Sequence, residues 1–270
     1  MELIDKYKRL KGIIRGMERV VVAFSGGIDS TLLLRACIDA IGRENVLALI
    51  GSSPVFPKRE IKDAETIANT IGSEYLIEDI PVMLRPEFVK NDRQRCYYCK
   101  GLLFEKARNI AIGRGFTHVA EGSNKDDMKE SRPGRRACIE QEVVSPLILA
   151  EMTKKDIREL SRILSLPNHD RPAFPCLATR IPYGTPIDAH LLKRIELSED
   201  FIKGLGITQI RVRCHGSIAR IEVAKDEATK IIENREKIVQ ALLHFGFIYI
   251  TLDLEGYRTG SMDILPLHSI

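Results

Sequence analysis

Residues 25–30 read SGGIDS. They follow RVVVAF at 19–24, a continuous apolar and β-branched run that is typical of a strand buried on both faces of a parallel sheet. They lead directly into TLLLRACIDAIG, whose apolar residues recur at helical spacing. This stretch therefore predicts a strand, a tight turn at the two glycines, and a helix with Asp29 and Ser30 in its first turn.

The predicted turn has the features of a phosphate site. Backbone N–H groups at the start of a helix favour an anion, and glycine lets phosphate oxygens approach because it has no Cβ. The pattern is neither a Walker A loop nor G-x-G-x-x-G. We therefore expect a phosphate loop of another kind, with an ordinary strand-to-helix turn as the alternative.

Strand and helix patterns alternate through the first two-thirds of the chain, which indicates parallel β/α units. The expected strands are 45–50, 74–79 and 117–122, the expected helices are 57–71, 96–112 and 153–166, and the segment 142–147 continues the pattern. Thr153 and Asp156 resemble a capping box. We predict an α/β domain with a parallel sheet at 1–166.

The regular alternation of strand and helix patterns ends at residue 167. Five prolines in PNHDRPAFPCLATRIPYGTP predict an irregular connector at 167–186, which carries Cys176. The remainder predicts a smaller α/β domain at 187–270 that binds substrate or mediates oligomerisation. Its expected helices are 187–204 and 225–243, and its expected strands are 208–213, 217–223 and 246–253.

Composition limits the class of protein. No apolar run approaches the length of a membrane span, and the charged N-terminal stretch is unlike a signal peptide, so we expect a cytoplasmic protein with no membrane partner. Thiols stay reduced in that compartment, so the six cysteines are expected to be ligands, nucleophiles or core residues. A net charge of +4 is only mildly basic, and we expect no nucleic-acid partner.

The hexapeptide resembles the pyrophosphate loop of the N-type ATP pyrophosphatases, which cleave ATP between its α and β phosphates and adenylate a substrate oxygen. The resemblance implies ATP and Mg²⁺ as ligands, with Asp29 acting in catalysis. In that fold the ends of the second and fourth strands embrace the nucleotide. The positions implied for the nucleotide and Mg²⁺ are Ser25, Gly26, Gly27, Asp29, Ser30, Ser52 and Gly122.

Two carboxylates, Asp126 and Asp127, follow the fourth expected strand. Either suits Mg²⁺, which prefers oxygen ligands, and Asp127 is our predicted ligand. A solvated acidic turn is the alternative.

Three of the six cysteines are expected to be structural. Cys37 lies among apolar residues of an expected helix, where free cysteine packs as a small apolar group. Cys138 and Cys214 have no companion at ligand spacing. That leaves the pair Cys96 and Cys99 in RCYYCK, and Cys176 in the proline-rich connector.

Three stretches together resemble the LarE family of ATP-dependent sacrificial sulfur transferases: AFPCLATRIPYG, GITQIRVRCHGSIARIE and LDLEGYRTG. The resemblance covers essentially the whole chain. It implies adenylation of a carboxylate of pyridinium-3,5-biscarboxylic acid mononucleotide, followed by sulfur insertion to give a thiocarboxylate for a nickel-pincer nucleotide cofactor. Cys176 matches the cysteine that single-cysteine members sacrifice as the sulfur donor.

The pair in RCYYCK distinguishes this chain from single-cysteine members. Three thiolates, Cys96, Cys99 and Cys176, are one short of the four that close an iron–sulfur cluster. This matches a branch of the family with a 4Fe-4S cluster, in which sulfide is the donated sulfur. The alternatives are direct thiol or persulfide chemistry, a zinc site, and simple packing.

The resemblance also implies residues that bind the anionic substrate. The matching positions are Lys100, Arg180, Arg211, Arg213 and Arg258. Arginine suits planar, bidentate contact with phosphate or carboxylate, and a surface strand with charged side chains is the alternative. Glu199 and Glu222 match acidic metal-binding positions of a relative, but Lys230 stands where that site has aspartate, so we predict no metal there.

Two other functions remain open from the sequence. A tRNA-thiolating enzyme would use the same ATP and cluster chemistry, and a non-catalytic nucleotide or iron–sulfur sensor would bind ligands without releasing products. The expected partners are a nucleotide-like small molecule, sulfide or another sulfur donor, and further copies of the chain, with a hexamer suggested by relatives.

Overall fold

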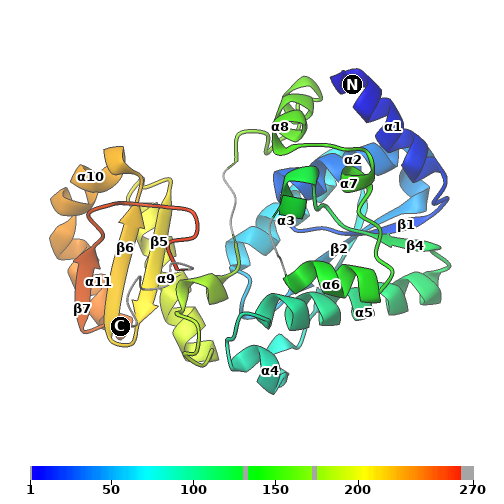
Figure 1. Ribbon diagram of the computed structural model, residues 1–270. Coiled ribbons are helices and arrows are strands. Elements are labelled where there is room, and N and C mark those ends of the chain that lie inside the picture. The colour runs from blue at the N-terminus through cyan, green and yellow to red at the C-terminus, as the bar shows by residue number, and fades with distance from the viewer. Residues whose placement is uncertain (1, 130–132, 172–174, 263–270) are drawn as a thin grey trace. The chain divides into compact units, whose positions relative to one another are not determined.

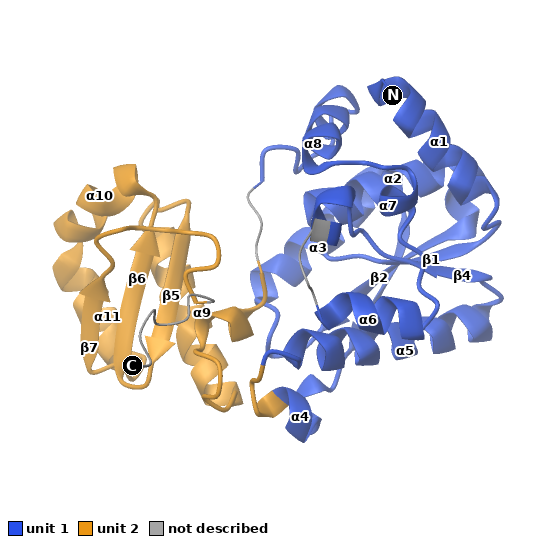
Figure 2. Cartoon of the chain, in the orientation of Figure 1, with its two compact units in different colours: residues 1–88, 93–174 blue, residues 89–92, 175–270 orange. Residues whose placement is uncertain are grey.

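The computed structural model describes residues 2–129, 133–171 and 175–262. The chain divides into two compact units (Figure 2). The first comprises residues 1–88 and 93–174, and the second comprises 89–92 and 175–270. The predicted division into 1–166, a connector and 187–270 stays a prediction.

The first unit contains a four-stranded sheet with the order β3-β2-β1-β4, in which every neighbouring pair is parallel. The strands are β1 Val20–Ala23, β2 Val46–Ser52, β3 Glu74–Asp79 and β4 His118–Ala120. The predicted α/β fold with a parallel sheet is therefore confirmed.

Both faces of this sheet are covered by helices (Figure 1). The helices of the first unit are α1 Leu3–Arg15, α2 Ile28–Ile41, α3 Lys58–Ile71, α4 Pro86–Val89, α5 Arg95–Arg114, α6 Pro133–Glu140, α7 Pro146–Leu149 and α8 Lys154–Ile163. Val20 and Val22 of β1 pack in the core formed with α1, α2 and α8, whereas Val21 packs in the core formed with α5 and α6. Alternate side chains of a strand point to opposite faces, which explains why the whole of β1 is apolar.

The second unit contains a three-stranded sheet with β6 in the middle. Its strands are β5 Ile210–His215, β6 Ile218–Val223 and β7 Tyr249–Leu252, with β5 antiparallel and β7 parallel to β6. Its helices are α9 Ala189–Gly204, α10 Ala228–Glu233 and α11 Arg235–His244. Along β5, Ile210, Val212 and Cys214 alternate with charged residues, so the two faces of the sheet differ in polarity.

Some elements differ from the expectation. The segment 142–147 forms only a single parallel bridge between Val144 and Ala120 before α7 begins at Pro146. The helix expected at 225–243 is two helices that meet at Asn234. Apolar periodicity continues through the break, which is why the sequence pattern did not separate them. No helix within the described ranges combines the length and apolarity needed to cross a membrane.

Candidate active site

The phosphate loop is a preformed turn of backbone between β1 and α2. Gly26 has φ +69°, and a Cβ there would lie 2.9 Å from Ala64, so only glycine fits. Gly27 is the N-cap of α2. Inside the loop, the Ser30 hydroxyl donates to the Gly27 carbonyl at 3.0 Å, and Ser25 Oγ lies 3.1 Å from Ser30 Oγ. The predicted strand–turn–helix is therefore present.

The end of β4 lies directly against this loop. A Cβ on Gly122 would lie 2.9 Å from the backbone nitrogen of Ser30 and 3.2 Å from the carbonyl carbon of Asp29. Glycine at this position therefore lets the segment after β4 touch the first turn of α2. Ser52 is the last residue of β2, the strand that pairs with β1 on the side opposite β4. Its carbonyl accepts a hydrogen bond from the Ile80 N–H at 2.8 Å.

Asp29 lies in a partly buried group of polar side chains. Its carboxylate accepts hydrogen bonds from the Lys154 ammonium at 2.5 Å and from the Asn124 side-chain amide at 3.5 Å. Burial raises the pKa of Asp29, the lysine opposes that rise, and the negative charge of Asp127 adds to it. Two carboxylates close enough to interact, beside a phosphate loop, match the sparse protein ligation of Mg²⁺ in nucleotide sites.

The two carboxylates after β4 have different tasks. Asp126 accepts from the backbone N–H of Lys154 at 2.9 Å, so it caps the start of α8. Asp127 accepts from the Asn124 N–H at 2.9 Å and interacts electrostatically with Asp29. The arrangement therefore favours Asp127 as the Mg²⁺ ligand, which stays a prediction.

Glu121 connects the phosphate-loop edge to the helix that carries Cys96 and Cys99. It is 6% exposed, and its carboxylate lies 3.3 Å from the Lys100 ammonium. Burial would raise the pKa of Glu121, but Lys100 and the Ser145 and Ser123 hydroxyls outweigh it and lower that pKa. Burial would lower the pKa of Lys100, but the nearby carboxylate and the Cys138 and Cys96 thiols raise it. Lys100 is thus a cation paired with Glu121 on the helix that carries Cys96 and Cys99.

Burial separates the six cysteines into two groups. Cys37, Cys138 and Cys214 are buried, as predicted for structural residues. Cys96 is exposed, and Cys99 and Cys176 are partly exposed. All six fall within the described residues and none is in a disulfide.

The three exposed thiols are divided between the two units. Cys96 and Cys99 occupy the first turns of α5, and Cys176 precedes a short 3-10 helix, Leu177–Arg180, in the second unit. Within the described residues, no group of three or more His, Cys, Asp or Glu side chains is arranged to hold a metal ion. The three-thiolate site therefore stays a prediction.

The backbone around Cys176 is held by an internal arginine. Arg180 has no exposed surface, and its guanidinium donates to the Pro175 carbonyl at 2.6 Å and the Cys176 carbonyl at 3.0 Å. The same side chain forms an ion pair with Glu199 at 2.9 Å. Arg213 donates to the Thr179 carbonyl at 3.1 Å from the neighbouring strand. In this structure Arg180 therefore positions the Cys176 loop, and a direct substrate contact for it stays a prediction.

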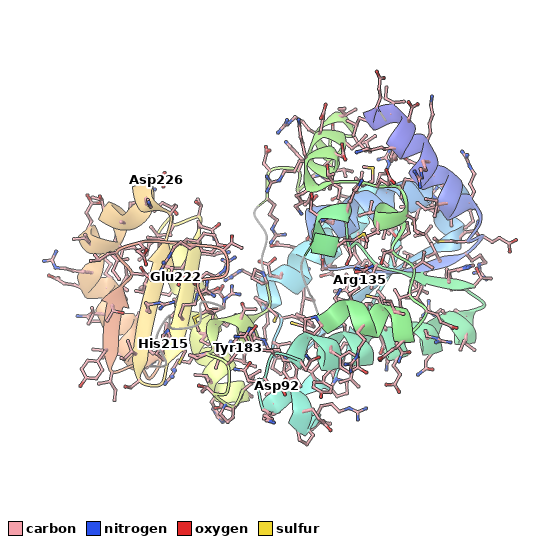
Figure 3. All side chains as sticks on the ribbon, viewed as in Figure 1. Asp92, Arg135, Tyr183, His215, Glu222 and Asp226 are labelled. Atoms are coloured by element: carbon pink, nitrogen blue, oxygen red, sulfur yellow. The ribbon has the colours of Figure 1, made fainter. Side chains whose placement is uncertain are left out.

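The polar face of the second sheet gathers the other predicted anion-binding arginines. Arg211 and Arg213 are two residues apart on β5 and nearly fully buried, and Glu222 pairs with Arg213 at 2.8 Å. Burial and the neighbouring Arg180 lower the pKa of Arg211 to about 10. Figure 3 marks Glu222 and His215 on this sheet. Arg180, Arg211 and Arg213 are thus buried near the carboxylates of Glu199 and Glu222.

Arg258 lies at the edge of this network. It pairs with Asp253 at 3.3 Å and with Glu255, and a third of its side chain is exposed. Glu199 and Glu222 form ion pairs with Arg180 and Arg213, respectively.

Four residues of the phosphate site were not recognised in the sequence. They are Glu121, Asn124, Lys154 and Asn168. Glu121 and Asn124 lie directly after β4, close in sequence to Asp126 and Asp127, and could have been included with these aspartates. Lys154 and Asn168 reach the loop from more than 120 residues away, and no local pattern marks them.

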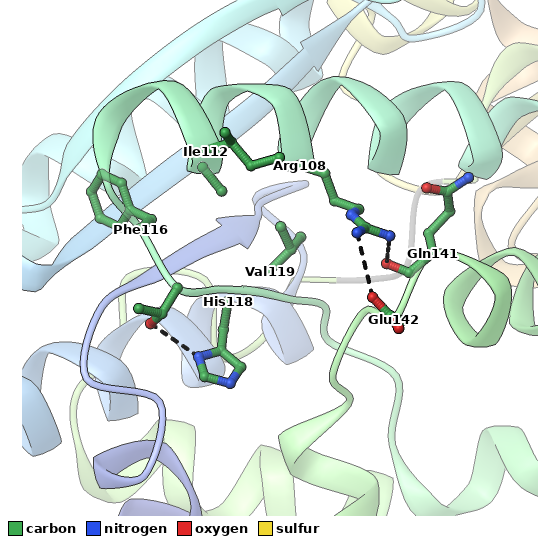
Figure 4. A pocket seen from close by; sticks show the side chains of 9 residues that line it. Arg108, Ile112, Phe116, His118, Val119, Gln141 and Glu142 are labelled. Carbon is green, nitrogen blue, oxygen red and sulfur yellow. Dashed lines mark hydrogen bonds and ion pairs between the residues drawn. The ribbon is translucent and has the colours of Figure 1, made fainter.

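A separate pocket of about 420 Å³ lies where β4 begins (Figure 4). Arg108 lines it and bonds to the Gln141 carbonyl and the Glu142 carboxylate, each at 3.3 Å. His118 pairs with Val20 at the first residues of their strands. The phosphate loop follows the last residues of β1, so this pocket is distinct from the phosphate site.

Comparison with known proteins gives matches of different extent. A family model described as NAD synthase matches residues 7–108. An NH(3)-dependent NAD(+) synthetase of Methanococcus aeolicus is 28% identical over 163 residues, which cover 55% of this chain and 60% of the synthetase. An uncharacterized protein of Synechocystis sp. is 35% identical over 263 residues, which cover 97% of this chain and 98% of that protein.

One relative of similar length has a named activity. The pyridinium-3,5-bisthiocarboxylic acid mononucleotide synthase of Lactiplantibacillus plantarum is 33% identical over 261 residues, which cover 97% of this chain and 95% of the synthase. The match includes both units, whereas the NAD synthase model ends at residue 108 and does not reach residues 175–270 of the second unit. The chain therefore belongs to the family of this synthase, the LarE family, and its first unit is an N-type ATP pyrophosphatase domain.

Proposed function

We propose that the chain is an ATP-dependent sulfur transferase. It adenylates a carboxylate of pyridinium-3,5-biscarboxylic acid mononucleotide and inserts sulfur to give a thiocarboxylate for the nickel-pincer nucleotide cofactor. The observation that carries the proposal is that the chain contains both a preformed phosphate loop and a partly exposed Cys176 whose backbone carbonyl is bonded by Arg180. Membership of the synthase family over both units supports it.

The first step forms an acyl adenylate. A carboxylate oxygen of the substrate attacks the α-phosphorus of ATP, the bond to the β-phosphate breaks, and pyrophosphate leaves. Backbone N–H groups of the loop hold the pyrophosphate at the start of α2. Asp29 and Asp127 would hold Mg²⁺, which supplies positive charge beside the phosphates. Lys154, now paired with Asp29, provides a cation at the same place.

The second step replaces oxygen by sulfur. A carboxylate is a poor electrophile, and AMP turns one of its oxygens into a leaving group. A sulfur nucleophile adds to the acyl carbon, and AMP departs with the electrons of the C–O bond. The buried arginines of the second sheet would hold the phosphate and carboxylates of the substrate, because arginine bonds both groups in a planar, bidentate way.

The three non-buried cysteines suit a 4Fe-4S cluster in their donor chemistry. Cys96, Cys99 and Cys176 are the thiols with exposed surface, whereas the other three are enclosed in the core. Such a cluster, when bound, supplies an iron with an open position for the sulfur to be transferred. Arg180 bonds the backbone carbonyl of Cys176, and Lys100 lies next to Cys99 in the chain on the same helix, α5.

Anaerobic reconstitution followed by iron and sulfide analysis tests the cluster. We expect about four irons per chain in the wild type, a loss of most iron in Cys96→Ala, and no loss in Cys138→Ala, whose thiol is buried on the neighbouring helix α6. Zinc without iron in the wild type would overturn the cluster.

Product counting tests the reaction. With ATP, sulfide and the pyridinium dicarboxylate, several thio products per chain require a replenished donor, whereas at most one sulfur per chain indicates sacrifice of Cys176. Ligand binding without release of AMP or pyrophosphate would identify a sensor. Tight tRNA binding that weakens steeply with salt would instead support tRNA thiolation.

A further inference from the structure

Asn168 contacts the phosphate loop from a distant part of the chain. It lies in the turn that follows α8 and is 5% exposed. Its side-chain Nδ2 donates to the Gly26 carbonyl at 2.8 Å and to Thr31 Oγ1 at 2.9 Å. One amide group therefore bonds both the turn of the loop and the first turn of α2.

These contacts fix the direction of one peptide group in the loop. A trans peptide is planar, so the carbonyl of Gly26 and the N–H of Gly27 point in opposite directions. Because Asn168 holds that carbonyl on its own side, the Gly27 N–H is directed away from Asn168. Here that N–H donates to Ser25 Oγ at 3.3 Å, within the loop.

The orientation of the Asn168 amide is set by chemistry. A backbone carbonyl only accepts, so Nδ2 must face Gly26. The consequence is that Oδ1 is buried and no donor among the described residues reaches it. An unsatisfied buried acceptor is costly, so general packing alone does not account for an amide here.

The same segment is anchored at a second point. Arg171 forms an ion pair with Glu60 of α3 at 2.9 Å and also bonds Asp63. Ala64, in the next turn of α3, is the residue against which Gly26 packs. The turn after α8 and the helix α3 thus enclose the outer side of the loop at Gly26.

We propose that Asn168 is a positioning residue of the phosphate loop: it aims the Gly27 N–H at the pyrophosphate part of ATP. This rests on the proposed use of ATP. This positioning requires a side chain that donates hydrogen bonds, because Asn168 donates one hydrogen to the Gly26 carbonyl and one to Thr31 Oγ1. A carboxylate of the same shape cannot do this and would repel the Gly26 carbonyl.

Calorimetric binding of inorganic pyrophosphate, ATP and AMP tests the proposal on the full chain. In Asn168→Asp we expect pyrophosphate and ATP to bind roughly 10- to 30-fold more weakly at neutral pH, as the loss of two hydrogen bonds predicts. AMP, which lacks the β and γ phosphates, should change much less. Asn45→Ala is the matched control, because it also removes an amide bond to a carbonyl, Ile41 at 2.8 Å, in the same unit.

A pH series separates positioning from a general structural role. Protonation of the introduced carboxyl restores one donor, so the deficit relative to the wild type should shrink as pH falls toward 5. A merely structural defect would not recover in this way. If Asn168→Asp does not fold, Thr31→Val removes one of the two acceptors and should weaken pyrophosphate binding by a smaller factor.

The outcomes distinguish the two proposals. If the wild type binds neither ATP nor pyrophosphate, the proposed function fails. If the wild type binds both, and Asn168→Asp and Thr31→Val bind pyrophosphate as tightly, the inference about Asn168 is wrong and the proposed function stands.

Discussion

The phosphate loop and the Cys176 loop are held in place by different forces. The phosphate loop depends on backbone geometry: Gly26 has a positive φ, and Gly122 lies directly against Ser30. The Cys176 loop depends on buried charge, since Arg180 bonds its carbonyls and Glu199 balances Arg180. The phosphate loop presents neutral N–H donors for a phosphate, whereas the Cys176 loop has the buried guanidinium of Arg180 bonded to its backbone.

This difference predicts how each region responds to substitution. A backbone-held loop fails when atoms are added, because there is no space for them. A charge-held loop fails when one partner is removed, because the other stays buried without compensation. Three substitutions test this contrast.

The largest effect is expected at the buried ion pair. Glu199→Gln leaves Arg180 buried without the carboxylate that pairs with it, and we expect the free energy of unfolding to fall by about 3–5 kcal/mol. Glu236→Gln is the control, because that carboxylate is 82% exposed and should change stability by less than about 0.5 kcal/mol. Urea denaturation measures both. Similar losses in the two variants would contradict the charge-held description.

The same pair predicts a dependence on pH. Burial alone would raise the pKa of Glu199, but Arg180, Arg211 and the Val212 N–H lower it from 4.5 to about 2. A lowered pKa in the folded state means that the stabilisation is complete above pH 4.5 and is lost as pH falls toward 2. The stability gap between wild type and Glu199→Gln should therefore be largest at neutral pH and narrow below pH 4.5. A gap that stays constant would show that ionisation of Glu199 is not the cause.

A smaller effect is expected where an atom is added beside the phosphate loop. Gly122→Ala places a Cβ 2.9 Å from the Ser30 nitrogen. Overpacking of this kind costs about 1–3 kcal/mol. If the whole of this cost distorts the phosphate loop, ATP should bind roughly 5- to 150-fold more weakly. Gly113→Ala, where a Cβ meets nothing within 4 Å, should leave binding unchanged. Calorimetric titration with ATP would contradict the prediction if both variants bound equally well.

The smallest effect on stability is expected at the pair between Lys154 and Asp29. Lys154→Met removes a partly exposed ion pair and should change the free energy of unfolding by less than about 1 kcal/mol. Since Lys154 lowers the pKa of Asp29, its removal should raise that pKa further. Carboxyl NMR titration measures this. Lys155→Met, at the exposed neighbouring residue, is the control. An equal rise in the pKa of Asp29 in both variants would contradict a specific ion pair between Lys154 and Asp29.

Much of this protein could be predicted from the sequence alone. The apolar runs of β1 and β2 and the alternation of strand and helix patterns predicted the parallel sheet, and Gly26 and Gly27 between strand and helix predicted the loop, because these patterns are local properties of the sequence. The burial of Cys37, Cys138 and Cys214 also agrees with the structural role expected from their neighbours and spacing.

Only the tertiary structure decided which distant residues serve the loop and which charges are enclosed. Lys154 and Asn168 reach Asp29 and Gly26 across 125 and 142 residues. Arg180 and Glu199 were named from the sequence only by their match to family positions, and their complete burial as an ion pair is visible only in the structure. Contacts of this kind depend on how whole elements pack against one another. The periodicity of a single element shows which of its faces is buried, but it does not show which other element packs on that face.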